Sequence, residues 1–144
     1  MRQGHATSGT AQRAAHPLSG QGLLFKLGDE VQSLRADLGR ATGGRAAKTL
    51  AKSDRLRVTL VLLQGGVTLD PQASAGGSSL HVLEGRLRVQ ADSRVLEARP
   101  GDLVVLGENL RQPIQAEEDA AFLVTVAWPE GAGAWEQEAA TGRL

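Results

Sequence analysis

The chain has 144 residues, a formal net charge of zero and no cysteine, with 41% hydrophobic and 22% charged residues. This length suits a single domain with one core, and the balanced charge argues against a nucleic-acid partner, which normally requires a basic face. The lack of cysteine excludes disulfides and thiolate metal ligands, and no apolar stretch is long enough to span a membrane. Because the first 22 residues lack the apolar core of a secretory signal, we expect a cytoplasmic protein.

A flexible N-terminal tail and one short helix are predicted at the start of the chain. Residues 1–22 are small and polar and bury too little apolar surface to offset the entropy cost of ordering them. A helix is predicted over about residues 28–39, where Asp29 can cap the first turn and Gly39 can end the helix. The apolar stripe of this helix, which must pack on another element, consists of Leu27, Val31, Leu34 and Leu38.

The segment from about residue 46 to residue 128 has the pattern of an all-β barrel. Short apolar runs, the first RLRVTLVLL (55–63) and the last AFLVTVAW (121–128), are separated by turn signals such as EGR, RPGD and EEDA. Several short strands at this spacing predict a β-sandwich or a small barrel, and closure into a barrel protects the strand edges. Residues 129–144 are polar and rich in Gly and Ala, which predicts a C-terminal tail, although Trp135 could pack back on the barrel.

Three stretches of this segment resemble the conserved barrel of the cupin superfamily: VLEGRL, RPGDLVVL and the closing strand AFLVTVAW. The resemblance covers roughly 80 residues, the size of one small barrel, and is strongest with small single-domain cupins that have an N-terminal helix. It implies a double-stranded β-helix, or jelly roll, in one domain over residues 23–128. It also implies a pocket inside the barrel, which in most cupins holds a divalent metal.

Cupins place their metal ligands in two motifs, and the spacing of the first motif fits this chain between Gly66 and Gly85. That motif has a glycine, five residues, His-x-His, three or four residues, Glu, six residues and a glycine. The two histidine positions fall on Gln72 and Ser74, and the glutamate position falls on Ser78. The resemblance therefore implies a first motif whose ligands are replaced by an amide and two hydroxyls.

The second cupin motif has a glycine, five residues, Pro-x-Gly, two residues and a histidine. Here it begins at Gly101, with Gly107 and Asn109 in the Pro and Gly places, and its histidine position falls on Gln112. The four ligand positions together thus carry two Gln and two Ser residues. The resemblance implies that these four side chains face the barrel pocket.

The side chains at these positions are poor ligands for a transition metal, which is held in proteins by imidazole, carboxylate or thiolate. The chain has three histidines, of which His5 and His16 lie in the predicted tail. His81 follows Ser78 by three residues on the same strand, so the alternation of side chains puts the two on opposite faces. We therefore expect no metal and no other cofactor.

A polar but uncharged pocket is left, and two interpretations of it stay open. Gln72, Ser74, Ser78 and Gln112 could orient a small molecule between apolar walls, with Arg111 anchoring an anionic group at the mouth. Alternatively, these groups could bond one another or ordered water in a barrel that binds nothing. Buried amides need partners in either case, so the sequence does not separate the two.

Carboxylates at barrel ends and turns are the remaining candidates for chemistry. A pair drawn from Asp70, Glu84 and Glu108 could perform acid–base catalysis, but Glu84 and Glu108 have the sequence context of solvated turn residues. Asp102 follows Pro-Gly and is expected to hold its turn by hydrogen bonds to the backbone. We therefore assign no catalytic residue from the sequence.

Three classes of function follow from these residues. The first is a metal-free cupin barrel that binds or senses a small molecule. The second is a cupin enzyme, such as an isomerase, a lyase or a dioxygenase-like protein, with a non-standard site that uses Asp70, Glu108 or Arg111. The third is a non-catalytic dimeric scaffold, because the resemblance implies a homodimer formed through a barrel face and exchanged N-terminal segments. The partners that we expect are a small-molecule ligand and a second copy of the chain.

Overall fold

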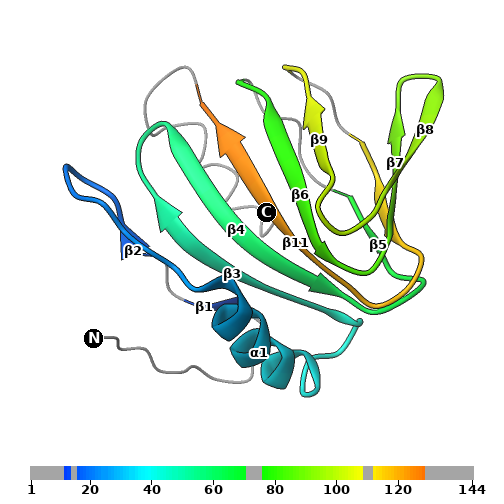
Figure 1. The fold of residues 1–144 in the computed structure, drawn as a ribbon, viewed down its shortest axis with the longest axis horizontal. Coiled ribbons are helices and arrows are strands. Elements are labelled where there is room, and N and C mark those ends of the chain that lie inside the picture. Colours follow the sequence, from blue (N-terminus) through cyan, green and yellow to red (C-terminus); the bar gives the residue numbers. More distant parts are fainter. Residues whose placement is uncertain (1–11, 14–15, 71–75, 109–111, 129–144) are drawn as a thin grey trace.

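The structure is a computed structural model that describes residues 12–13, 16–70, 76–108 and 112–128. It contains a large sheet and a small sheet that face each other, with one helix on the outer side of the large sheet (Figure 1). The large sheet has the order β1-β3-β4-β11-β6-β9, with β2 also paired to β3. The small sheet has the order β5-β10-β7-β8.

The strands of the large sheet are β1 (Gln12–Arg13), β2 (His16–Pro17), β3 (Arg45–Lys52), β4 (Leu56–Leu63), β6 (Ser78–Glu84), β9 (Leu103–Leu106) and β11 (Ala120–Ala127). Those of the small sheet are β5 (Thr68–Leu69), β7 (Leu87–Ala91), β8 (Arg94–Ala98) and β10 (Ile114–Ala116). From β4 onward the chain crosses repeatedly between the two sheets. This arrangement is a jelly roll, so the predicted all-β barrel with one short helix is confirmed.

Strand β4 shows why the barrel has two apolar layers. Its sequence LRVTLVLL is buried on both faces: Val61 and Leu63 belong to the core between the sheets, whereas Leu60 and Leu62 belong to a second cluster beneath the helix. Successive strand residues point to opposite faces, and an unbroken apolar run therefore serves two layers at once. The outer layer exists because the helix covers this part of the sheet.

Helix α1 (Leu27–Leu38) lies across β3 and β4 (Figure 1). Val31 and Leu34 are buried on the sheet, with Leu27 and Leu38 partly buried beside them, so the predicted stripe is the packed face. The helix ends with Gly39 at the C-cap position, as predicted, but Gly39 keeps a right-handed φ of −63° and its N–H still makes a helical hydrogen bond to the Arg35 carbonyl over 3.2 Å. Asp29 does not cap the helix, because Lys26 occupies the N-cap position and Asp29 lies within the first turn. There its charge favours the positive end of the helix dipole.

Part of the predicted N-terminal tail is paired with the barrel. β1 and β2 both run parallel to β3, with Gln12 opposite Ala47 and His16 opposite Ala51. The His16 ring also lies 5.6 Å from the Phe25 ring. The expectation of a flexible tail is therefore corrected at residues 12–13 and 16–17. Strand pairing uses backbone groups, which an estimate based on apolar side chains does not count.

The two glycines that bracket the first motif are required by the backbone. Gly66 has a φ of +90° and Gly85 a φ of +81°, a region that residues with a side chain rarely adopt. At Gly85 a Cβ would also lie 2.2 Å from the Asp119 carbonyl oxygen. These glycines make the turns at the two ends of the segment, whatever side chains stand between them.

Candidate functional site

The space between the two sheets is filled by apolar side chains over most of its length. Phe122, Leu63 and Val82 are fully buried there. Others in the same cluster are Val61, Leu69, Leu80, Leu87, Val89, Ala98, Val104, Leu106, Ile114, Ala116, Ala120 and Val124. Protein interiors of this kind are packed as tightly as organic crystals. Polar chemistry inside the barrel is therefore found toward its ends.

The inner face of the large sheet becomes polar where β4 begins. Arg57 and Thr59 share the inward parity of Val61 and Leu63, and they are only 6% and 4% exposed. The Thr59 hydroxyl lies 3.4 Å from the hydroxyl of Thr49 on β3. At this end of β3 and β4, the inward side chains are therefore polar where the rest of the inner face is apolar. Thr49 and Thr59 form one cross-strand pair, and Arg57 lies two residues before Thr59.

Two more polar side chains, Lys52 and Ser78, lie in the same row across the sheet as Arg57. Lys52 on β3 pairs directly with Arg57, and Val126 pairs with Arg57 on the other side. Val126 in turn pairs with Ser78, the first residue of β6. Two strand spacings separate Arg57 from Ser78, or roughly 10 Å. We call this region, made of Thr49, Lys52, Arg57, Thr59 and Ser78, the polar end of the barrel.

Trp128 closes the polar end beside Arg57. Its N–H donates to the Arg55 carbonyl over 2.9 Å, which extends the pairing of β11 with β4 by one residue. The alternation of side chains along a strand therefore puts Trp128 on the same face as Val124 and Val126. The side chain is 5% exposed, yet its indole Nε1 has no hydrogen-bond partner. A buried donor without a partner costs about 1–3 kcal/mol. An unsatisfied donor of this kind is typical of a site that accepts a ligand or water.

Gln112 approaches the same end from the small sheet. It precedes Ile114, which pairs with Leu69 and Val89 in the core, and its side chain is partly buried. Strand β10 runs from there toward Ala116, opposite Leu87 and next to the turn where β6 ends. Gln112 therefore lies toward the end of the barrel where β6 begins, which is the end of Ser78.

Of the five predicted pocket residues, the structure places two. Ser78 and Gln112 lie toward the polar end, and their role in a pocket stays a prediction. Gln72, Ser74 and Arg111 lie outside the described residues, so their positions stay predictions. His81 pairs with Leu103 and Leu123, on the face of β6 opposite Ser78 and Leu80.

The candidate carboxylates do not gather inside the barrel. Asp70 and Glu108 are exposed, and Glu84 forms an ion pair with Arg35 of α1 over 2.7 Å at the other end of β6. Asp102 has the structural role that was predicted, because its carboxylate accepts the Arg99 N–H over 2.9 Å. Its own N–H donates to the Arg99 carbonyl over 2.8 Å, which closes the turn between β8 and β9.

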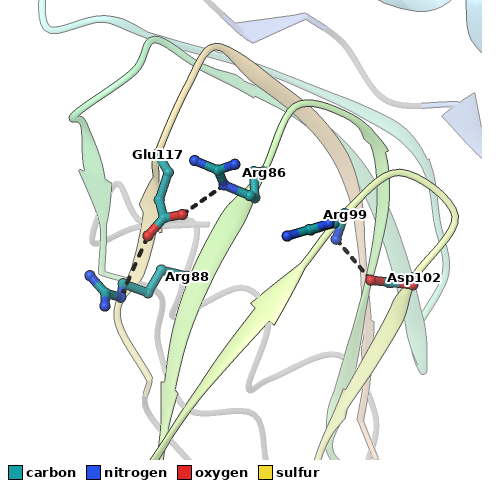
Figure 2. A network of polar contacts seen from close by, with 5 residues as sticks. All are labelled: Arg86, Arg88, Arg99, Asp102 and Glu117. Carbon is teal, nitrogen blue, oxygen red and sulfur yellow. Dashed lines mark hydrogen bonds and ion pairs between the residues drawn. The ribbon is translucent and has the colours of Figure 1, made fainter.

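The opposite end of the barrel is held by an ion-pair network (Figure 2). Glu117 accepts a hydrogen bond from Arg86 over 2.8 Å and lies 3.6 Å from the Arg88 guanidinium. The hydrogen bond and the charge of Glu117 raise the pKa of Arg86. The Glu117 N–H also donates to the Arg86 carbonyl over 2.9 Å. We call Arg86, Arg88 and Glu117 the latch end, because they join β7 to the start of the β10–β11 turn.

A cleft of about 230 Å³ lies outside the barrel, between the end of α1 and the turns that follow β4 and β10. Its charged members already have partners within the protein. Arg35 is paired with Glu84, and Asp119 accepts the Gly65 N–H over 2.8 Å. This cleft is therefore a gap between structural contacts.

The donor set of the polar end does not fit a metal ion. Hydroxyls, an indole N–H and a guanidinium offer no anionic ligand, and the positive charge of Arg57 opposes a cation. Within the part of the chain that the structure describes, no three His, Asp or Glu residues come together in a way that could hold a metal. We derive no metal chemistry for this site.

Sequence reasoning missed Arg57, Thr59 and Trp128. The signal was present in RLRVTLVLL, where Arg57 and Thr59 share the parity of Val61 and Leu63. A charged residue near the start of a strand is usually exposed, however, and only the pairing with β3 and β11 shows that Arg57 is covered. Trp128 was included in the last strand without a role.

Comparison with known proteins identifies the class of fold. At 21% identity, a conserved protein of unknown function from Streptococcus pyogenes superposes with a TM-score of 0.58 over 62% of this chain and 79% of that chain. A cupin superfamily protein from Desulfitobacterium hafniense superposes with a TM-score of 0.57 at 16% identity, over 63% of this chain and 86% of that one. The fold of this chain is therefore the cupin fold.

A third similar structure is the cupin_2 domain of an XRE family transcriptional regulator from Enterobacter cloacae. Its TM-score is 0.55 at 15% identity, with 60% of this chain and 99% of that chain covered. No family model and no curated protein sequence matches the chain. None of the helices in the described ranges is long and apolar enough to cross a membrane.

Proposed function

We propose that this chain is a small-molecule binding or sensing module that uses a cupin barrel without a metal. The single observation that carries the proposal is the buried indole Nε1 of Trp128, a donor without a partner beside the buried Arg57. A pocket with apolar walls and a few convergent polar groups is the usual form of a small-molecule site. In this proposal, the apolar side chains between the sheets contact the nonpolar part of the ligand, and the side chains of the polar end bind its polar groups.

The predicted pocket residues fit this proposal. Ser78 and Gln112 add a hydroxyl and an amide at the polar end, and Gln72, Ser74 and Arg111 stay predicted members of the same pocket. A sensing role is supported by the similar cupin_2 domain, whose printed name places it in a transcriptional regulator. An enzyme with a non-standard site stays a prediction, with no observation here that favours it.

A thermal-shift screen of metabolites tests the binding function. A ligand at one hundred times its Kd stabilises the folded state by about 2.7 kcal/mol, which raises the Tm by about 5 to 10 °C for a domain of this size. Elemental analysis of the purified protein is the companion measurement. Stoichiometric bound metal, or the absence of any shift across neutral, cationic and anionic metabolites, would contradict the proposal.

Self-association is a second candidate property, favoured by an uncovered apolar surface. Helix α1 covers β3 and β4, but on the same outer face Leu103 is 62% exposed and Val105 71% exposed on β9. Their neighbours on β6 are His81 and Ser79. We propose that a second copy of the chain packs on this face, as the cupin resemblance implies.

Light scattering after size-exclusion chromatography tests the dimer. We expect twice the chain mass of 15.1 kDa for the wild type and a shift toward one chain mass for Val105→Glu, because a charge buried in an interface is costly. Val95→Glu is the matched control, since Val95 is 46% exposed on β8 of the other sheet. A wild-type protein of one chain mass would exclude the dimer.

A further inference from the structure

The polar end of the barrel is rich in donors and positive charge, which specifies the chemistry of a ligand. Arg57 and Lys52 are directly opposite each other on the inner face, and the Trp128 indole is a donor that cannot accept. The hydroxyls of Thr49, Thr59 and Ser78 can donate or accept. A group that only accepts hydrogen bonds, and that carries negative charge, complements this set.

Among the residues that the structure describes, no carboxylate occupies an inward position of this region. Within the described part of β3, β4, β6 and β11, the inward side chains at the polar end are Thr49, Lys52, Arg57, Thr59, Ser78 and Val126. The nearest described acids in the flanking turns, Asp54, Asp70 and Glu108, are exposed. Lys52 and Arg57 each have an interaction of their own within the protein. Their two like charges on one face of the sheet still favour a ligand group of negative charge over a positive one.

The register brings the guanidinium and the indole within reach of one small group. Val126 is opposite Arg57, and Trp128 follows Val126 by two residues on the same face, so Arg57 and Trp128 are diagonal neighbours. Diagonal neighbours in an antiparallel pair are about 7–8 Å apart at Cα, a distance that long and aromatic side chains bridge. A carboxylate has two oxygens, so one can accept from Arg57 while the other accepts from Trp128 Nε1.

We propose that the pocket takes a small organic carboxylate, whose carboxylate group is bound by Arg57 and the Nε1 of Trp128. This inference rests on the proposed binding function of the same site. Arg57 has an interaction of its own within the protein, so the ligand joins or replaces that contact, whereas the indole N–H gains its first partner. The two acceptor oxygens of a carboxylate match the donors of Arg57 and Trp128 at this end.

The test uses intrinsic fluorescence of the full chain. The protein has two tryptophans, so Trp135→Phe leaves Trp128 as the single reporter. The probes are matched pairs with the same skeleton, benzoate with benzamide and succinate with succinamide, together with inorganic phosphate. We expect at least one carboxylate to change the Trp128 emission and to raise the Tm, and its amide to bind about 10- to 100-fold more weakly, because a hydrogen bond to a charged group contributes more than a neutral one.

Variants then assign the contacts, with the thermal shift as the readout. Arg57→Gln and Trp128→Phe are each expected to weaken carboxylate binding by about tenfold or more, and Arg88→Gln, on the outer face of the small sheet, is expected to leave it unchanged. If Arg57→Gln does not fold, the Trp128→Phe variant and the comparison of each acid with its amide still test whether the site binds a carboxylate group. Equal or tighter binding of the amides, or of phosphate, overturns the carboxylate assignment but leaves a binding pocket. No shift with any of these probes overturns the carboxylate assignment, and the wider metabolite screen then decides whether the binding function fails with it.

Discussion

The two ends of the barrel differ in how their charges are used. At the latch end, Arg86 and Arg88 share the carboxylate of Glu117, and the side chains are about one fifth to one half exposed. At the polar end, Arg57 is 6% exposed and is a diagonal neighbour of Trp128, whose indole Nε1 has no hydrogen-bond partner. A partly exposed network of opposite charges stabilises a turn, whereas a buried donor set rich in positive charge is costly to maintain.

This contrast distinguishes polar groups that stabilise the fold from polar groups that are available to a ligand. Most buried polar groups in proteins have hydrogen-bond partners, and an exception requires an explanation. The latch end meets the general rule. Among the described residues, the unsatisfied indole of Trp128 lies at the other end of the barrel, toward which Ser78 and Gln112 also lie. The unsatisfied donor and the predicted pocket residues that the structure describes are thus at the same end.

The largest effect is expected in the apolar layer that separates the two ends. Phe122 is fully buried and packs among the residues between the sheets. Phe122→Ala removes most of that side chain and leaves a cavity, so the free energy of unfolding should fall by about 3–5 kcal/mol. Urea unfolding measures this change. A loss below about 1 kcal/mol would show that the ends are not separated by a packed core.

The next effect concerns the backbone of the latch end. Gly85→Ala combines a φ of +81° with a Cβ placed 2.2 Å from the Asp119 carbonyl, so the free energy of unfolding should fall by at least about 2 kcal/mol. Gly101→Ala is the control, because Gly101 has a φ of +94° but no heavy atom within 4 Å of the added Cβ. That variant should lose only about 1 kcal/mol, from the left-handed conformation alone. Equal losses in urea unfolding would contradict the close approach at Gly85.

The long strands could be predicted from the sequence, and the short ones could not. The apolar runs at 55–63 and 121–128 predicted strands within one residue of the observed bounds of β4 and β11, because each run is long and bounded by polar or turn-forming residues. β5 has two residues and β10 three, too few for any alternation to appear. These strands exist because β10 pairs with β5 on one side and with β7 on the other, which is information about tertiary structure.

The candidate site was predictable only in part. The spacing of the cupin motifs pointed to Ser78 and Gln112, and the structure places both toward one end of the barrel. Arg57 was not predicted, because its burial depends on β3 and β11 pairing on either side of β4. Trp128 was not predicted either, since an unsatisfied indole becomes visible only when the neighbours of its nitrogen are known.

A smaller effect is expected at the ion pairs of the latch end. Glu117→Gln removes the charge that Arg86 and Arg88 share, and urea unfolding should show a loss smaller than that of Gly85→Ala because these groups are partly solvated. The pKa of Arg86 is raised above its ordinary value by the hydrogen bond and the charge of Glu117, so its contribution to stability is fully present below that ordinary value and is lost only as the pH rises through the raised pKa. The loss should therefore be equal at neutral pH and at about pH 9. A loss that disappears at the higher pH would contradict this role of Arg86.

The smallest effect locates the boundary between the polar end and the apolar core. Thr59 and Val61 are two residues apart on the same face of β4, and they are 4% and 1% exposed. Thr59→Val removes a hydroxyl whose distance to the Thr49 hydroxyl is 3.4 Å, at the limit of a useful hydrogen bond. The free energy of unfolding should therefore change by less than about 0.5 kcal/mol.

The reverse exchange one row deeper is the matched control for Thr59→Val. Val61→Thr places a hydroxyl among apolar neighbours of the core, so it should cost about 1–3 kcal/mol. Urea unfolding of the two variants compares the same pair of side chains on one strand face. If the polar end tolerates hydroxyls because a ligand or water meets them, the two exchanges must differ. Equal costs would place Thr59 in the core and would remove the distinction between the polar end and the layer below it.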